Sequence, residues 1–317
     1  MVCSRSRYGI VKHRNLTTRG FTRLRRDTTR REREGLATQI QPQTQPVPTP
    51  VEPPHPRVRK HAGFASRFLP GVRDISVYMP PEYDEDRKRS YPLLLLQDGQ
   101  NLFDPETSFI RGKTWRVAEH ADEAIAAGEV EPLVIAGVAN AGERRLAEYT
   151  PSRDMKMGGG EANKYALMVT REVLPFLHAY YRLRSGPDST GIGGSSLGGL
   201  VSLWMGLRHP DIFGKLAVMS PSVWWNHRYI LAYLNDVAPE LHRRPRIWLD
   251  AGDQEGRRTW TDAEMLHARL RKHGWRDEVD LHFETIVGGT HDEASWSERV
   301  RPMLRFLFPA ETSEGSK

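Results

Sequence analysis

Short apolar segments alternate with longer segments of helical periodicity along most of the chain. Several of the short segments are apolar at consecutive positions, which is typical of a strand buried on both faces of a parallel sheet. Strands that alternate with helices predict an α/β fold with a doubly wound, mostly parallel sheet in a single domain. The expected strands are 74–79, 92–97, 132–138, 189–195, 215–220, 245–250 and 279–286, and the expected helices are 161–181, 196–208, 260–273 and 292–308.

The first 60 residues have a different composition from the rest. An arginine-rich stretch is followed by the Pro/Gln-rich run "QIQPQTQPVPTPVEPPHP" at 39–56, whose repeated X-Pro steps favour extended or disordered chain. We therefore expect a disordered tail and linker over 1–60, the α/β domain over 61–310, and a short polar C-terminal tail over 311–317.

The net charge of +6 arises from this tail. Residues 1–36 contain 11 Lys/Arg and three Asp/Glu, a net charge of +8, so the other 281 residues carry −2. A charged run of this kind is usually a solvated segment, and we do not expect nucleic-acid binding.

Cysteine content and apolar run length exclude other classes of protein. The only cysteine, Cys3, allows neither an intrachain disulfide nor a cysteine metal cluster. Apolar runs such as 93–96 and 133–139 fall far short of the roughly 20 residues that cross a bilayer, and no secretory h-region is visible. We expect a cytoplasmic protein without a membrane span, metal or organic cofactor; the sequence leaves the oligomeric state open.

The glycine-rich stretch "GIGGSSLGGL" at 191–200 follows an expected strand and opens an expected helix. Gly194, Ser196 and Gly198 match G-x-S-x-G, the turn that holds a nucleophilic serine in a strained conformation at the carboxyl end of a sheet. Ser195 does not match, because Leu197 stands where its second glycine would be needed. Ser196 is the expected nucleophile, Ser195 fills the turn, and the Leu197 amide is an expected oxyanion donor.

A serine hydroxyl needs a base, and that base needs an acid that orients it. His291 in "VGGTHDEASW" follows the last expected strand on a glycine-rich loop, where a base would reach Ser196, whereas the other downstream histidines lie on expected helices, loops or strand faces. The turn "DAGDQEG" after the strand 245–250 offers three acids, and the pattern leaves all three open: Asp250, Asp253 and Glu255.

The loop "QDGQNLF" after the strand 92–97 is placed to supply a second oxyanion donor. Gly99 allows the backbone to turn so that its own amide or that of Gln100 points inward. For the side chains of Asp98 and Asn101 we expect hydrogen bonds within the loop.

Together with "ANAGERRLAEYTP" and "GGSSLGGLVSLWMGLRHPDIFGKLAVMSPSVWW", these motifs make the chain resemble the putative esterase family of α/β-hydrolases, from about residue 64 to 308. That family includes esterase D, enterochelin esterases, feruloyl esterase modules and mycolyltransferases, and the enterochelin-esterase-like branch is the most similar. The resemblance implies an α/β-hydrolase fold and a cofactor-free serine carboxylic-ester hydrolase. Its implied residues are nucleophile Ser196, base His291, acid Glu255, and oxyanion amides of Leu197 and Gln100.

The substrate is harder to predict than the reaction. The short segment 226–244 has room for about one short helix, so we expect no large cap there and an open cleft for a small-molecule or oligomeric ester. Two alternative functions stay open: acyl transfer through the same triad, and ligand binding on a non-catalytic hydrolase fold. The expected substrate contacts are Trp115, Arg145, Tyr149, Trp224 and Trp225.

Overall fold

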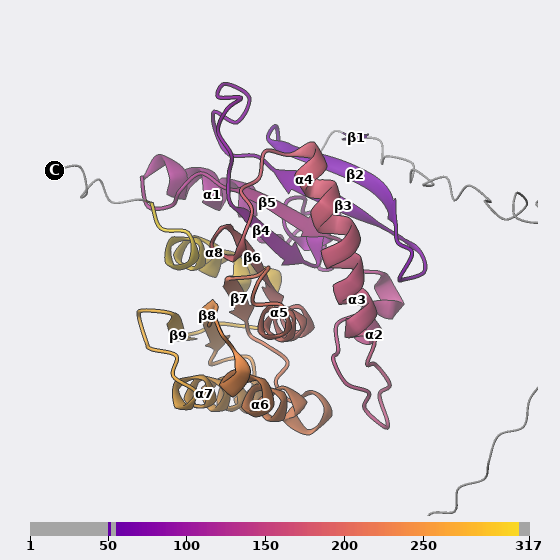
Figure 1. The fold of residues 1–317 in the computed structure, drawn as a ribbon, viewed down its shortest axis with the longest axis vertical. Coiled ribbons are helices and arrows are strands. Elements are labelled where there is room, and N and C mark those ends of the chain that lie inside the picture. The colour runs from indigo at the N-terminus through magenta and orange to yellow at the C-terminus, as the bar shows by residue number, and fades with distance from the viewer. Residues whose placement is uncertain (1–49, 52–54, 311–317) are drawn as a thin grey trace, which may run out of the picture. The chain divides into compact units, whose positions relative to one another are not determined.

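The computed structural model describes residues 50–51 and 55–310. Their strands form one nine-stranded sheet in the order β1-β2-β3-β5-β4-β6-β7-β8-β9 (Figure 1). The predicted C-terminal tail and nearly all of the predicted N-terminal tail lie outside the described residues. The strands are β1 (Pro50–Val51), β2 (Val58–Ala65), β3 (Val72–Tyr78), β4 (Leu93–Gln97), β5 (Val134–Val138), β6 (Thr190–Ser195), β7 (Lys215–Met219), β8 (Arg246–Gly252) and β9 (Leu281–Ile286).

Most of this sheet is parallel, as the alternating pattern predicts. β5, β4, β6, β7, β8 and β9 pair in parallel, and β1, β2 and β3 extend the sheet in antiparallel pairs beyond β5. Parallel neighbours bring their carboxyl ends to one edge, so the loops after β4, β6, β8 and β9 meet there.

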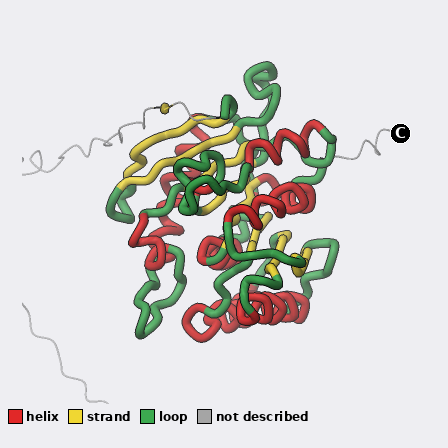
Figure 2. Tube along the Cα trace, turned by 180° about the vertical axis from the view of Figure 1, so that it is seen from behind, coloured by secondary structure: helices red, strands yellow, loops and turns green. Residues whose placement is uncertain are grey.

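Helices cover both faces of the sheet, as Figures 1 and 2 show. In β4, Leu93 and Leu95 pack into the core shared with α3 to α7, and Leu94 and Leu96 pack into the core shared with α1 and α8. Successive strand residues point to opposite faces, so two covered faces explain the uninterrupted apolar run. The helices are α1 (Val117–Ala126), α2 (Arg145–Glu148), α3 (Ala162–Met168), α4 (Leu174–Tyr180), α5 (Leu197–Arg208), α6 (Trp225–Val237), α7 (Arg257–Lys272) and α8 (Glu293–Leu307).

The observed elements differ from the expected ones at four points. The helix expected over 161–181 is interrupted by a π-helical segment, Val169–Val173, between α3 and α4. Two elements were not expected from the sequence: α1, which is rich in alanine and acidic residues, and β2, in which buried positions alternate irregularly with exposed or partly exposed ones. Since β2 begins at Val58, regular structure starts before residue 61, the expected domain boundary.

The segment between β7 and β8 contains α6 and a single 3-10 turn, Ala238–Glu240, in agreement with the expected short helix. No helix of the described residues is long and apolar enough to cross a membrane.

Candidate active site

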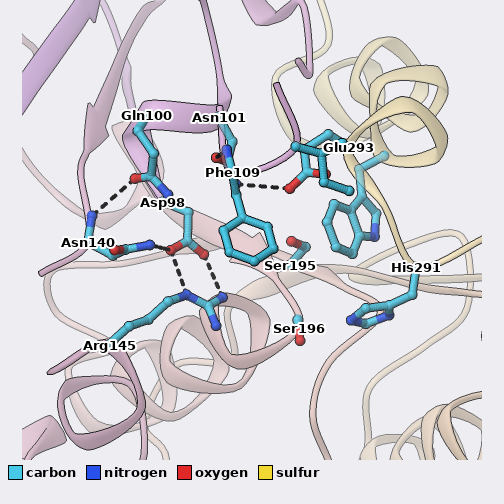
Figure 3. Close-up of a pocket in the computed structure, with 12 residues that line it drawn as sticks. Asp98, Gln100, Asn101, Phe109, Asn140, Arg145, Ser195, Ser196, His291 and Glu293 are labelled. Carbon is cyan, nitrogen blue, oxygen red and sulfur yellow. Dashed lines mark hydrogen bonds and ion pairs between the residues drawn. The ribbon is translucent and has the colours of Figure 1, made fainter. Parts of the chain in front are cut away.

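A cavity of about 210 Å³ opens where the loops after β4, β6 and β9 meet (Figure 3). Ser196 and His291, which the sequence analysis placed on different strand ends, both line it. The full lining consists of Asp98, Gln100, Asn101, Phe109, Ile110, Asn140, Arg145, Ser195, Ser196, His291, Glu293 and Trp296.

Ser196 lies in the sharp turn between β6 and α5, with φ 57° and ψ −121°. This is a left-handed φ that a residue with a side chain adopts only under strain. The turn is also tight, because a Cβ on Gly194 would lie 2.9 Å from the Cβ of Gln97 and 3.0 Å from the carbonyl carbon of Gly198. Glycine at 194 therefore allows the strand to approach the following helix.

The Ser196 hydroxyl lies 3.2 Å from the Ser222 hydroxyl, on the loop after β7. No hydrogen bond joins Ser196 to His291 among the described residues, but Figure 3 shows the His291 ring pointing toward Ser196 across the cavity. Catalytic hydrogen bonds often form only when substrate is bound. Leu197, as the first residue of α5, has no preceding turn to accept a hydrogen bond from its amide.

Of the three acids that the sequence left open, Glu255 is the one that contacts His291. Its Oε2 lies 2.9 Å from Nδ1 of His291, and its side chain is fully buried. The His291 ring also packs edge-on against Trp296, with ring centroids 4.9 Å apart. These two contacts fix the position of the imidazole from both sides.

Asp250 and Asp253 have other partners. Asp250 is fully buried and accepts hydrogen bonds from Arg299 Nη1 at 2.7 Å and Trp248 Nε1 at 2.6 Å. Asp253 accepts a hydrogen bond from the Gly288 amide at 2.8 Å, and so joins the turn after β8 to the loop after β9.

Arg299 on α8 is a buried residue of this region that the sequence analysis missed. Its guanidinium donates to Glu255 Oε1 at 3.0 Å, to Asp250 Oδ1 at 2.7 Å and to Ser220 Oγ at 2.8 Å. The side chain is only 1% exposed. Nothing in the sequence distinguishes Arg299 from the solvated arginines of the same helix, because the carboxylates it meets come from a distant turn.

The two carboxyls that share Arg299 differ in pKa. Burial raises the pKa of Glu255, but the hydrogen bonds from His291, Ser220 and the Gly252 amide, with the charge of Arg299, outweigh it and leave the pKa below its ordinary value. Burial also raises the pKa of Asp250, and there Arg299 and Trp248 offset the effect only in part. The carboxyl that contacts His291 is therefore held in its ionised form.

The loop after β4 is fixed by an ion pair. Asp98, with a left-handed φ of 55°, accepts hydrogen bonds from Nε and Nη2 of Arg145, both at 2.7 Å, and from Asn140 at 2.7 Å (Figure 3). The Gln100 side chain accepts a hydrogen bond from the Asn140 amide at 3.1 Å. Burial lowers the pKa of Arg145, but the charge and hydrogen bonds of Asp98 outweigh it and raise the pKa, so the pair stays charged.

Three of the expected substrate contacts are buried and lie away from the cavity. Trp115, Tyr149 and Trp225 are at most 1% exposed, and none of them lines the cavity. Trp225 donates its indole N–H to the Ser152 carbonyl, while Tyr149 lies beneath Arg145. Aromatic residues near strand ends were expected to face the substrate, but these three fill the core instead.

The other two expected contacts have different outcomes. Arg145 lines the cavity, whereas Trp224 does not and lies beside Arg258, whose guanidinium is 5.8 Å from its ring centroid. The sequence analysis missed Phe109 and Ile110, which are 84% and 37% exposed at the cavity. No group of three or more His, Cys, Asp or Glu in the described part of the chain is arranged to hold a metal ion.

Residues 66–307 match the family model described as "Putative esterase". The chain belongs to the putative esterase family. This confirms the resemblance seen in the sequence motifs, and together with the relatives named as esterases it supports ester hydrolysis as the activity.

Relatives of the chain differ in how much of their own length the match covers. "Uncharacterized protein YbbA" of Bacillus subtilis is 25% identical over 260 residues, which are 78% of this chain and 96% of that protein. "Iron(III) salmochelin esterase" of Escherichia coli is 28% identical over 241 residues, 71% of this chain and 51% of the relative. "Iron(III) enterobactin esterase" of Dickeya dadantii is 27% identical over 80% of this chain and 55% of its own length. The chain thus spans about half the length of these two siderophore esterases.

Solved structures show the same fold. The BES protein from Bacillus cereus aligns with a TM-score of 0.66 at 21% identity, over 82% of this chain and 99% of that one. An IroE-like serine hydrolase from Shewanella oneidensis aligns with a TM-score of 0.65 at 17% identity, over 79% and 80% of the two chains. These neighbours confirm the α/β-hydrolase-like fold.

Proposed function

We propose that the protein is a serine carboxylic-ester hydrolase in which Ser196 is the nucleophile, His291 the base and Glu255 the acid. The observation that carries this proposal is the 2.9 Å contact between the buried Glu255 carboxylate and His291, on the wall of the cavity that Ser196 also lines. A base oriented by an acid beside a strained serine is the arrangement that activates a hydroxyl for attack.

In the acylation step, His291 Nε2 takes the proton from the Ser196 hydroxyl as its oxygen bonds to the ester carbonyl carbon. The resulting oxyanion is stabilised by the amides of Leu197 and Gln100. Glu255 accepts the hydrogen bond from Nδ1 and stabilises the imidazolium. The intermediate then collapses, the carbon–oxygen bond to the alcohol breaks, and the alcohol leaves with the proton of His291.

In the deacylation step, a water molecule gives a proton to His291 and adds to the acyl carbon. The second tetrahedral intermediate breaks the bond to Ser196, which recovers its proton from His291, and the carboxylic acid is released. The products are one acid and one alcohol, and this chain's own groups supply every proton transfer.

The cavity supports a small-molecule ester as the substrate. Its volume of about 210 Å³ has room for a modest acyl or alcohol group. The exposed side chains of Phe109 and Ile110 offer an apolar surface to the part of the substrate that extends out of the cavity. Asn140 and Arg145 line the same cavity with polar groups (Figure 3). We therefore propose an ester with an apolar part near the scissile bond.

Hydrolysis of a panel of alkyl and aryl esters by the wild type and by Ser196→Ala tests the proposal. The wild type should release acid and alcohol in equal amounts, and Ser196→Ala should lose at least about 1,000-fold in kcat because no other group replaces the nucleophile. Hydrolysis by Ser196→Ala at the wild-type rate would overturn it. Thermal unfolding of both proteins checks that the variant is folded.

A further inference from the structure

Glu293 lines the cavity but is not part of the proposed triad. It is the first residue of α8, two positions after His291, and is only 3% exposed. Figure 3 shows its carboxyl pointing toward Asn101 on the side of the cavity where Phe109 lies. A charged residue this deeply buried normally has a partner for each of its oxygens.

The two oxygens of this carboxyl have different surroundings. Oε1 accepts a hydrogen bond from Asn101 Nδ2 at 3.2 Å. Oε2 is buried and has no hydrogen-bond partner among the described residues. Leaving a buried carboxylate oxygen without a donor costs free energy, so this atom favours any donor that enters the cavity.

The surrounding charges do not supply such a donor. The nearby side chains Asp292 and Asp98 are also acidic, and each already has a cation: Lys113 lies 3.3 Å from Asp292, and Arg145 pairs with Asp98. Burial raises the pKa of Glu293, and the negative charges of Asp292 and Asp98 add to this effect. The hydrogen bond of its own backbone amide and the charge of Lys113 offset it only in part. The raised pKa means that the surroundings disfavour the ionised carboxylate. A hydrogen-bond donor at Oε2 would stabilise this ionised form.

We propose that Glu293 is a specificity-determining residue whose Oε2 accepts a hydrogen bond from a donor group of the substrate, either a hydroxyl or a protonated amine. This inference rests on the proposed esterase activity. Asn101 holds the carboxyl in position through Oε1, and its own Oδ1 accepts a hydrogen bond from the Phe109 amide at 3.0 Å. The side chain of Asn101 therefore connects the Glu293 carboxyl to the loop that carries the apolar residue Phe109.

Three matched sets of small alkyl esters test the proposal: unsubstituted, hydroxyl-bearing and ammonium-bearing, with the substituent placed in turn on each carbon of the acyl and alcohol chains. The measured quantity is the ratio of kcat/KM for a substituted ester to kcat/KM for its unsubstituted partner. The wild type should prefer at least one substituted ester by about tenfold or more. The set in which the preference occurs distinguishes a hydroxyl from an amine.

Glu293→Gln should abolish that preference. Asn101 would hold the amide oxygen of the new side chain, which leaves an NH₂ group where Oε2 was, and a donor would then face the donor of the substrate. Glu293→Asp keeps the charge but withdraws the carboxyl, and should reduce the preference in part. Glu298→Gln is the matched control, because it removes the same charge from an exposed position of α8 and should keep the wild-type ratio.

The outcomes separate this inference from the proposed function. If the wild type hydrolyses unsubstituted esters through Ser196 but prefers no substituted ester, or if Glu293→Gln and Glu293→Asp both keep the preference, the role of Glu293 is wrong and the esterase proposal stands. If the folded wild type hydrolyses none of the esters, both proposals are contradicted.

Discussion

Arg299 donates a hydrogen bond to the carboxylate of Glu255 at 3.0 Å, from a helix 44 residues further along the chain. The same guanidinium holds Asp250 at 2.7 Å, so one buried cation fixes two carboxylates at the end of β8. Glu255 in turn contacts His291. We therefore expect Arg299 to act through Glu255 as a positioning residue for the proposed catalytic histidine.

Replacing Arg299 with methionine should damage both folding and catalysis. The variant leaves two buried carboxylates without their cation, which should lower the free energy of unfolding by about 3–5 kcal/mol. A displaced Glu255 should lower kcat/KM by about 100-fold. Urea unfolding and ester hydrolysis measure the two effects, and Arg299→Lys, which cannot reproduce the forked geometry, should recover activity only in part.

A pH profile separates the positioning role of Arg299 from a purely structural one. The cation helps to lower the pKa of Glu255, so in Arg299→Met this carboxyl stays protonated to higher pH and the low-pH loss of activity should begin at higher pH. The control is Arg301→Met, which removes another arginine of α8. Arg301 pairs at the surface with Glu129, and because such exposed pairs contribute little, its loss should leave stability nearly unchanged. Identical pH profiles for Arg299→Met and the wild type would contradict the role.

The pH dependence of stability should reveal the ionised state of Glu255. A carboxyl whose pKa is lower in the folded protein stabilises the fold above the ordinary glutamate pKa of about 4.3, and this contribution is lost as the pH falls through the lowered value. The difference in unfolding free energy between the wild type and Glu255→Gln should therefore be largest near neutral pH and shrink below about pH 4. Urea unfolding at a series of pH values measures it, and a difference that grows toward low pH would show the opposite sign.

The pair of Arg145 and Asp98 should affect catalysis through the loop that carries Gln100. Arg145→Met leaves the buried Asp98 carboxylate with Asn140 alone, and the loop should lose its fixed geometry. If Gln100 supplies an oxyanion amide, the loss should be about 10- to 100-fold and fall chiefly on kcat, because that amide acts in the transition state. Steady-state kinetics distinguishes an effect through the Gln100 loop from a direct contact with the substrate. A raised KM with an unchanged kcat would indicate that Arg145 contacts the substrate directly.

The contact between the turn after β8 and the loop after β9 should be sensitive to a single methyl group. A Cβ on Gly252 would lie 2.2 Å from the carbonyl oxygen of Gly289, so Gly252→Ala must push the Glu255 turn away from the His291 loop. We expect a loss of stability of about 1–3 kcal/mol and a large loss of kcat. In the control Gly206→Ala, the added methyl meets the core side chain of Leu216 and neither the Glu255 turn nor the His291 loop, so activity per folded molecule should remain.

The sequence predicted the parts of the site that depend on local pattern. Ser196 follows from glycine spacing between a strand and a helix, and His291 from its place after the last strand, because in a parallel sheet these ends meet at one edge. The choice among Asp250, Asp253 and Glu255 could not be made from spacing alone. It depends on which carboxylate reaches His291 across the turn, and only the three-dimensional positions give that contact.

The positions that the sequence did not predict belong to residues whose surroundings come from distant segments. Trp115 was expected to face a substrate and instead packs in the core, with its ring centroid 5.9 Å from that of Trp296. No expectation was attached to Arg299, which meets buried acids from a distant turn. Phe109 is an apolar residue in a loop, and nothing in its local sequence indicates that it stays exposed. Burial of a single side chain is set by its neighbours in space, which a one-dimensional pattern does not contain.

Covalent labelling with a fluorophosphonate probe tests the central proposal most directly, because the probe reacts with a serine only when a base activates it. Intact-mass measurement and peptide mapping of the folded wild type should show one adduct, on Ser196. Ser195→Ala should still be labelled, and Ser196→Ala and His291→Ala should not. A folded wild type that remains unlabelled while it hydrolyses esters, or an adduct on any residue other than Ser196, would contradict the assignment of the nucleophile.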